Sequence, residues 1–149
     1  QVKSSRWINY EEMNKLEVMA ELLEIYYNSG RFRETGRYLT EKTGSPFVFY
    51  ETLASLYSRD DVSCREWEGA ASLLLRFAEE KDIDNSIKKE IILEHYDKML
   101  EFHGDYGAII FRKLLHAYSK GYTGANEFRD LVNQISDKNI MRDLIESFF

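Results

Sequence analysis

The stretch NYEEMNKLEVMAELLEIYYNSG, residues 9–30, carries the start, the apolar face and the end of one helix. Asn9 and Glu12 have the spacing of a capping box, with asparagine in place of serine or threonine. Gly30 is placed to end the helix in the left-handed conformation. Between these signals, apolar residues recur every three or four positions and form one stripe: Met13, Leu16, Met19, Ala20, Leu23 and Tyr27.

Helix signals of the same kind recur along the rest of the chain, and no strand-like alternation competes with them. In the first half we expect a helix at 33–42 that stops before Gly44, a helix that starts at Ser45-Pro46, and a helix that starts at a capping box of Ser63 and Glu66. In the second half we expect a long helix that ends near Gly104 and a helix at 106–120; the long helix carries Ile87, Ile91, His95, Met99 and Phe102 on one face. Thr123 and Asp137 are expected to cap the last two helices. We therefore predict an all-α fold, a bundle of seven or eight short helices. The polar stretch 79–85 is the best hinge, which gives helical lobes at 1–80 and 85–149, and the sequence leaves open whether they share one core.

The composition provides a core and limits the functions. Hydrophobic residues make up 44% of the chain and aromatic residues 14%, which is more than a disordered chain carries. The net charge of −6 argues against binding nucleic acid through the whole surface but allows a local basic patch. No apolar run approaches the roughly 20 residues that span a bilayer, so we expect no membrane contact. A single cysteine, Cys64, fits a reducing, cytoplasmic setting.

The chain shows no complete catalytic or metal-binding constellation. The motifs G-x-S-x-G, G-x-x-x-x-G-K-[ST], G-x-G-x-x-G, H-E-x-x-H and C-x-x-C are all missing from the sequence. His95 and His103 lie two helical turns apart, too far to share a metal ion, and His95 is expected in the core. Cys64 beside Arg65 is interpreted as an incidental thiol, although that setting could lower its pKa. We predict no catalytic residue and no metal site in this chain.

Two features stand out as candidate working surfaces. One is an aromatic corner, Tyr26-Tyr27-Asn28-Ser29-Gly30-Arg31-Phe32. Its aromatic side chains either pack in the core beside a turn or form a docking surface for another domain. Its docking candidates are Tyr26, Tyr27, Asn28, Arg31 and Phe32. The other is residues 105–129, where four cations outnumber two carboxylates. This segment is either an ordinary solvated face or an RNA contact, because cations interleaved with aromatics suit phosphates and unstacked bases. Its candidates are Arg112, Lys113, His116, Lys120 and Arg129.

The first half of the chain resembles a known family. The residues that carry the similarity are Trp7, Glu11-Glu12-Met13, the run from Tyr26 to Phe32, Tyr38-Leu39 and Ser45-Pro46-Phe47. This half is similar to the C-terminal helical domain of cobalamin-binding radical SAM proteins. These proteins are similar to the anaerobic magnesium-protoporphyrin IX monomethyl ester oxidative cyclase. The resemblance covers about residues 6–80. It implies a parent oxidoreductase that uses S-adenosylmethionine, an iron–sulfur cluster and cobalamin. The three-cysteine and D-x-H-x-x-G motifs by which that family binds its cofactors have no counterpart in this sequence, so the resemblance implies that this chain holds none of them.

The tail resembles a different family. The residues that carry the resemblance are His95, Met99 and Gly104, followed by Phe111-Arg112-Lys113, Tyr118-Ser119-Lys120-Gly121 and Glu127-Phe128-Arg129. The tail looks like the helical tRNA-binding domain of bacterial tRNA-dihydrouridine synthases. The resemblance covers about residues 90–137 and implies that Arg112, Lys113, Lys120 and Arg129 contact tRNA.

The two resemblances lead to two expected functions. The first is a non-catalytic accessory domain that encloses substrate or docks against the preceding catalytic domains of the same polypeptide. The alternative is a module that presents tRNA to a flavin-binding barrel, and a plain protein-interaction bundle is a third. Because the chain opens with Gln1 and not methionine, we expect a fragment cut at a domain boundary.

Overall fold

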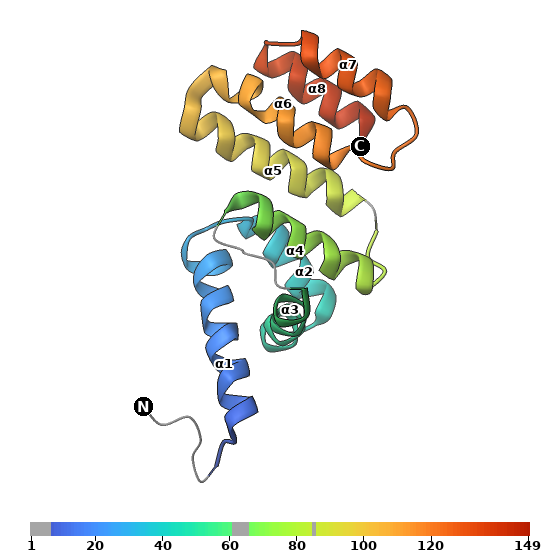
Figure 1. The fold of residues 1–149 in the computed structure, drawn as a ribbon. Coiled ribbons are helices and arrows are strands. Elements are labelled where there is room, and N and C mark those ends of the chain that lie inside the picture. Colours follow the sequence, from blue (N-terminus) through green and yellow to red (C-terminus); the bar gives the residue numbers. More distant parts are fainter. Residues whose placement is uncertain (1–6, 61–65, 85) are drawn as a thin grey trace. The chain divides into compact units, whose positions relative to one another are not determined.

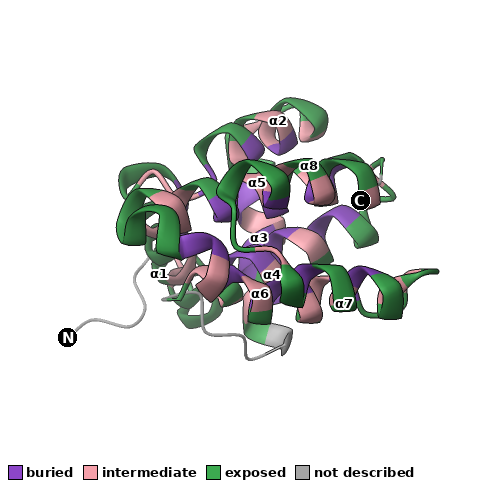
Figure 2. Ribbon diagram, turned by 90° about the horizontal axis from the view of Figure 1, so that it is seen from above, coloured by how far each residue is buried: buried purple, intermediate pink, exposed green. Residues whose placement is uncertain are grey.

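A computed structural model describes residues 7–60, 66–84 and 86–149, and the all-α prediction is confirmed. The described residues contain eight α-helices, one π-helical turn and one short 3-10 turn, and no strand (Figure 1). The chain divides into two compact units, unit 1 at Gln1–Asp84 and unit 2 at Asn85–Phe149. Each unit has a core of its own, with buried and exposed sides on its helices (Figure 2).

Unit 1 begins with the capping box that the sequence predicts. The Asn9 side chain accepts a hydrogen bond from the Glu12 backbone N–H at 2.8 Å, and the Glu12 carboxylate accepts one from the Asn9 N–H at 3.1 Å. The second helix ends before Gly44, as predicted, and Gly44 takes the left-handed conformation. The elements of unit 1 are α1 (Tyr10–Leu23), the π-helical turn (Glu24–Asn28), α2 (Arg33–Thr43), α3 (Pro46–Asp60) and α4 (Trp67–Glu80).

A sharp corner joins the π-helical turn to α2. Gly30 has a φ of 75°, and Phe32 also takes the left-handed conformation, with a φ of 52°. That conformation is uncommon for a bulky residue. The Phe32 side chain is fully buried and packs edge-to-face on Trp67, with ring centroids 4.9 Å apart. Burial of this ring against α4 stabilises the strained corner.

Unit 2 packs four helices around an aromatic and aliphatic core. Gly107 lets α6 approach α5, because a Cβ at this position would lie 2.6 Å from the Met99 carbonyl oxygen. The Tyr96 hydroxyl donates to the Lys138 carbonyl at 2.7 Å, which ties α5 to the start of α8. The elements are α5 (Ser86–His103), a 3-10 turn (Gly104–Tyr106), α6 (Gly107–Tyr118), α7 (Ala125–Gln134) and α8 (Lys138–Phe148).

Three local expectations are corrected by the structure. The helix expected from the Ser63 and Glu66 capping box instead begins at Trp67, with Glu66 as its N-cap residue; Ser63 lies outside the described residues. Thr123 does not cap α7, because the turn of two left-handed glycines places Gly124 at the N-cap. Phe102 shares a helix with Ile91 but is 83% exposed. Asp137 does cap α8, accepting from two backbone N–H groups.

The apolar stripe that begins on α1 is exposed to solvent, contrary to what its spacing predicts. An apolar stripe usually faces the core, but Leu16, Leu23 and Tyr27 are 44%, 41% and 67% exposed. The buried residues are instead Leu22 in α1 and Tyr26 in the π-helical turn that follows it. The stripe therefore lies on the outer side of the helix, and a neighbouring set of apolar residues anchors it.

Candidate functional site

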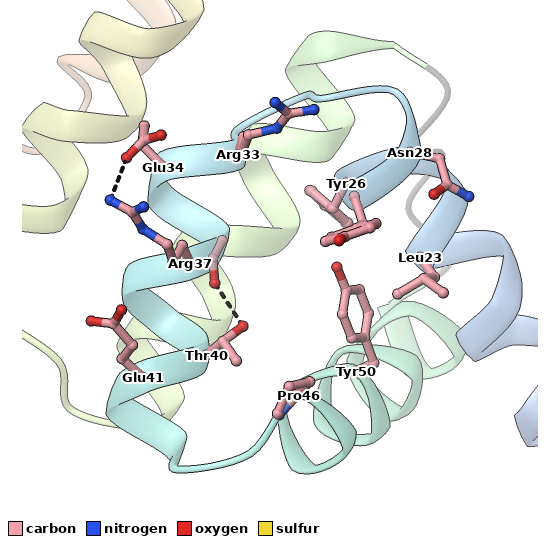
Figure 3. A pocket seen from close by; sticks show the side chains of 12 residues that line it. Leu23, Tyr26, Asn28, Arg33, Glu34, Arg37, Thr40, Glu41, Pro46 and Tyr50 are labelled. Carbon is pink, nitrogen blue, oxygen red and sulfur yellow. Dashed lines mark hydrogen bonds and ion pairs between the residues drawn. The ribbon is translucent and has the colours of Figure 1, made fainter.

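Unit 1 contains a pocket of about 730 Å³ between the π-helical turn, α2 and the start of α3 (Figure 3). This volume lies within the range of known small-molecule sites. Leucine, proline and three tyrosines form its apolar part, and side chains of α2 form a polar wall. The lining residues are Leu23, Tyr26, Tyr27, Asn28, Arg33, Glu34, Gly36, Arg37, Thr40, Glu41, Pro46 and Tyr50.

The aromatic side of the pocket depends on the π-helical turn. Tyr26 is 2% exposed and donates its hydroxyl to the Ala70 carbonyl of α4 at 2.7 Å, while Tyr27 lies at the surface. Tyr50 of α3 points toward Tyr26 across the pocket (Figure 3). Burial, with a contribution from nearby Tyr27, raises the pKa of the Tyr50 hydroxyl above its ordinary value. The Tyr50 hydroxyl therefore stays neutral near pH 7, and the three tyrosines offer flat ring surfaces with hydroxyl tips.

The polar wall comes from successive turns of α2. Arg37 forms an ion pair with Glu34 at 2.9 Å, and the Thr40 hydroxyl donates to the Gly36 carbonyl at 2.7 Å. Arg33 and Glu41 also line the pocket, so two cations and two carboxylates share this wall. The balance suits a polar or zwitterionic group more than a strongly charged one.

The structure divides the predicted aromatic corner between two environments. Tyr26, Tyr27 and Asn28 line the pocket, and the Asn28 amide donates to the Glu24 carboxylate at 2.6 Å. The Arg31 guanidinium lies over the Trp67 ring at 5.5 Å from its centroid, which is a cation–π contact. Phe32 packs on the same ring from inside the core. Only the first three candidates thus lie at the pocket.

The predicted basic segment lies on α6 and α7 of unit 2. Arg112 donates to the Ile135 carbonyl at 2.7 and 3.1 Å and to the Ser136 hydroxyl at 3.0 Å. His116 lies 3.0 Å from the Asn133 side-chain oxygen. These contacts join α6 to the end of α7, so both side chains have a packing role in the helical hairpin.

The other predicted cations of unit 2 differ in their exposure. Arg129 is half-buried and donates to the hydroxyl of buried Ser119 at 3.0 Å. Lys113 on α6 and Lys120 in the turn after α6 are both exposed. The segment therefore combines three cationic or polar groups used for packing with two lysines facing solvent.

His95 occupies the core of unit 2, as the sequence indicates. It is 1% exposed, lies edge-on to Phe111, and its Nδ1 atom is 2.7 Å from the Tyr118 hydroxyl. Burial lowers the pKa of His95 from 6.5 to about 4, so the ring is neutral near pH 7.

The side chains that complete the pocket have no signal in the sequence. Arg33, Arg37, Thr40 and Tyr50 follow ordinary helical patterns, and only the folding of α2 and α3 onto the π-helical turn brings them together. Within residues 7–60, 66–84 and 86–149, no cluster of three His, Cys, Asp or Glu residues could hold a metal ion. The Cys64 thiol lies outside the described residues. None of the described helices is long and apolar enough to cross a membrane.

Fold and site together define an all-α chain of two helical units with a pocket in the first. The chain belongs to the family described as a protein of unknown function (DUF4080), whose model matches residues 1–143 and so extends across both units.

Two curated relatives match part of the chain. It is 54% identical over 63 residues to the probable tRNA-dihydrouridine synthase of Helicobacter pylori strain ATCC 700392 / 26695, and equally to that of strain J99. The match covers 42% of this chain but only 19% of each relative. No solved structure matches the chain.

Proposed function

We propose that this chain is a non-catalytic accessory domain of a cobalamin-binding radical SAM oxidoreductase similar to magnesium-protoporphyrin IX monomethyl ester oxidative cyclase. The domain encloses substrate or docks against the preceding catalytic domains, in the cytoplasm. The pocket beside the aromatic corner is the observation that carries the proposal, because it offers a binding cavity with aromatic rings on one side and polar side chains of α2 on the other. Domains of the matching family occur in radical SAM and cobalamin-binding proteins, which supports this parent.

The cofactors belong to the parent and not to this chain. An iron–sulfur cluster needs about three or four thiolates, and the chain has a single cysteine. What the domain contributes is shape: aromatic rings that exclude water from whatever enters the pocket, and a polar wall on α2 that orients it.

Removal of the domain from the intact parent tests this function. We expect turnover or assembly of the parent to fall, and Tyr27→Ala with Asn28→Ala at the pocket mouth to reduce turnover while the protein stays folded. Phe102→Ala, which changes an exposed ring in unit 2, is the matched control. Full activity and stability after the deletion would refute the accessory role.

A second candidate function is tRNA binding by unit 2. It is favoured by the 54% identity to the two probable tRNA-dihydrouridine synthases over 63 residues, together with the exposed lysines of the basic segment in this unit. The exposed Lys113 and Lys120 would contact phosphates, while Arg112, His116 and Arg129 hold the α6–α7 hairpin and present their remaining donors.

Salt-dependent binding of tRNA to the 149-residue chain tests the second candidate. We expect affinity to fall as salt rises, and Lys113→Ala with Lys120→Ala to weaken binding about tenfold and to lessen the salt dependence. The control Lys98→Ala removes a lysine that pairs with Glu101 on the same unit. An absence of binding at low salt excludes this function.

A further inference from the structure

The outer side of α1 is an apolar surface that no described element covers. Leu16, Leu23 and Tyr27 are each more than 40% exposed. The spacing of the stripe is three, four, three and four residues, which is the pattern of a helix that packs lengthwise against another helix. Five of the six stripe residues have this spacing, namely Met13, Leu16, Ala20, Leu23 and Tyr27; Met13 and the sixth residue, Met19, are half-buried.

Packing within unit 1 leaves this side of α1 unused. The helix is fixed to α3 through its other side, where Lys15 and Glu51 form an ion pair at 2.9 Å. Leu22 is fully buried. At 100° per residue, the centre of the exposed stripe lies roughly 140° around the helix from Leu22. α1 therefore has two apolar faces, of which the fold uses one.

The rim of the exposed stripe is acidic. Glu24 borders it on one side, and Glu12 borders it on the other side near the start of α1. Lys15, the one cation among residues 10–28, points to α3 and pairs with Glu51. A partner with basic flanks would be attracted to this rim, and one with acidic flanks would be repelled.

The stripe leads into the pocket at its C-terminal end. Leu23 and Tyr27 belong to both surfaces, since both also line the pocket. Tyr26, Tyr50 and Pro46 line it as well (Figure 3). A helix lying along α1 could therefore insert one large apolar side chain into a pocket of about 730 Å³. Such an anchor is typical of helix-in-groove recognition.

We propose that the α1 stripe binds a basic amphipathic helix, which lies along the stripe and anchors one large apolar side chain in the pocket. The inference rests on the proposed accessory role, since it places this helix in the catalytic part that the domain serves. It adds the surface and the chemistry of the contact.

The charges of α1 disfavour two other occupants. A second copy of the chain would bring an equally acidic rim against the first, and the two rims would repel. An anionic lipid surface would be repelled for the same reason, because helices that lie on such membranes carry lysine and arginine on their polar face. Both occupants are outcomes that the experiment can detect.

Binding of a synthetic helix to the 149-residue chain tests the proposal. The probe is a peptide of about 20 residues with leucines at three- and four-residue spacing, one terminal phenylalanine and lysines on both flanks. Its counterpart carries glutamates in place of the lysines. By calorimetry or fluorescence anisotropy, we expect the lysine peptide to bind at least about tenfold more tightly than the glutamate peptide.

Two sets of variants locate the contact. Leu16→Gln with Leu23→Gln should weaken binding of the lysine peptide at least about tenfold. The matched control, Leu131→Gln with Ile140→Gln, changes residues of unit 2 that are 48% and 55% exposed and should leave binding intact. Glu24→Gln should weaken binding several-fold and lessen its salt dependence.

Several results would overturn the proposal: no binding of the lysine peptide, equal binding of both peptides, or equal effects of the stripe and control variants. Sedimentation showing a dimer that Leu16→Gln with Leu23→Gln dissociates would assign the stripe to a second copy. Binding to anionic vesicles through the same residues would assign it to a membrane. The outcome is separate from the proposed function, because the deletion experiment in the parent can fail while the peptide binds, and the reverse.

Discussion

Helices α1 and α8 begin alike and end up in opposite environments. Each has a side-chain cap, Asn9 or Asp137, and each carries an apolar stripe. In α8 the stripe residues Met141 and Ile145 are fully buried against the other helices of unit 2. The comparable stripe of α1 faces solvent, because α1 packs chiefly on α3. Periodicity locates an apolar face, but the neighbours available to a helix decide whether that face is buried.

The largest expected effect comes from two adjacent leucines of α1. Leu22→Ala should lower the free energy of unfolding of unit 1 by about 2–5 kcal/mol, because Leu22 is fully buried. Leu23→Ala should cost less than about 1 kcal/mol, since Leu23 is 41% exposed. Tryptophan fluorescence during urea unfolding reports on unit 1, which contains both tryptophans. Equal losses from the two substitutions would place the stripe of α1 inside a core, as in α8.

The next largest effect is a pH dependence of the stability of unit 2, which comes from a histidine buried in its core. The pKa of His95 is lowered to about 4 in the folded chain and is near 6.5 when unfolded. Between these values the unfolded state binds the extra proton, so stability falls as pH drops from about 6.5 to about 4, by about 3 kcal/mol in total. Hydrogen exchange in unit 2 at pH 7 and pH 5 measures this. In His95→Phe the fall should be smaller, and an unchanged fall would show that another group is responsible.

A smaller difference in stability is expected between variants of two neighbouring cations in unit 2, of which one packs against other residues and one faces solvent. Arg112→Ala should destabilise the unit by about 2 kcal/mol, because the Ile135 carbonyl and Ser136 lose their charged donor. Lys113→Ala should change stability by less than about 0.5 kcal/mol, since this neighbouring lysine is exposed. Thermal unfolding of the two variants gives the comparison. If both behave like wild type, Arg112 is as free for RNA as Lys113.

The smallest effect should be the same in α1 and α8. Asn9→Ala and Asp137→Ala each remove a side-chain cap and should each cost about 1 kcal/mol, although the two helices differ in burial. Caps act within one turn and do not depend on what the helix packs against. Hydrogen exchange at the first turns of α1 and α8 measures the cost at each end. Very unequal costs would mean that tertiary contacts at one of the two ends contribute as well.

Much of the helical framework could be predicted from the sequence, and the failures were specific. The Asn9 and Asp137 caps, the Gly44 stop and a core position for His95 follow from spacing over a few residues. Thr123 failed because two left-handed glycines set the start of α7.

Only part of the candidate pocket could be predicted in the same way. The aromatic corner contains three residues that line the cavity, Tyr26, Tyr27 and Asn28. The same run of residues sends Phe32 into the core instead. The α2 wall directly follows the corner in sequence, and Tyr50 lies farther along the chain, but neither carries a motif that marks it as part of a pocket.

What the sequence determined by itself was therefore local: helices, their caps, their apolar faces and the lack of a set of thiolates or histidines spaced for a metal. These properties depend on backbone hydrogen bonds and side-chain periodicity within a few turns. The tertiary structure decided which apolar face of α1 is buried and which residues enclose the pocket. Both outcomes depend on contacts between elements far apart in the chain, and residue spacing within a helix does not contain that information.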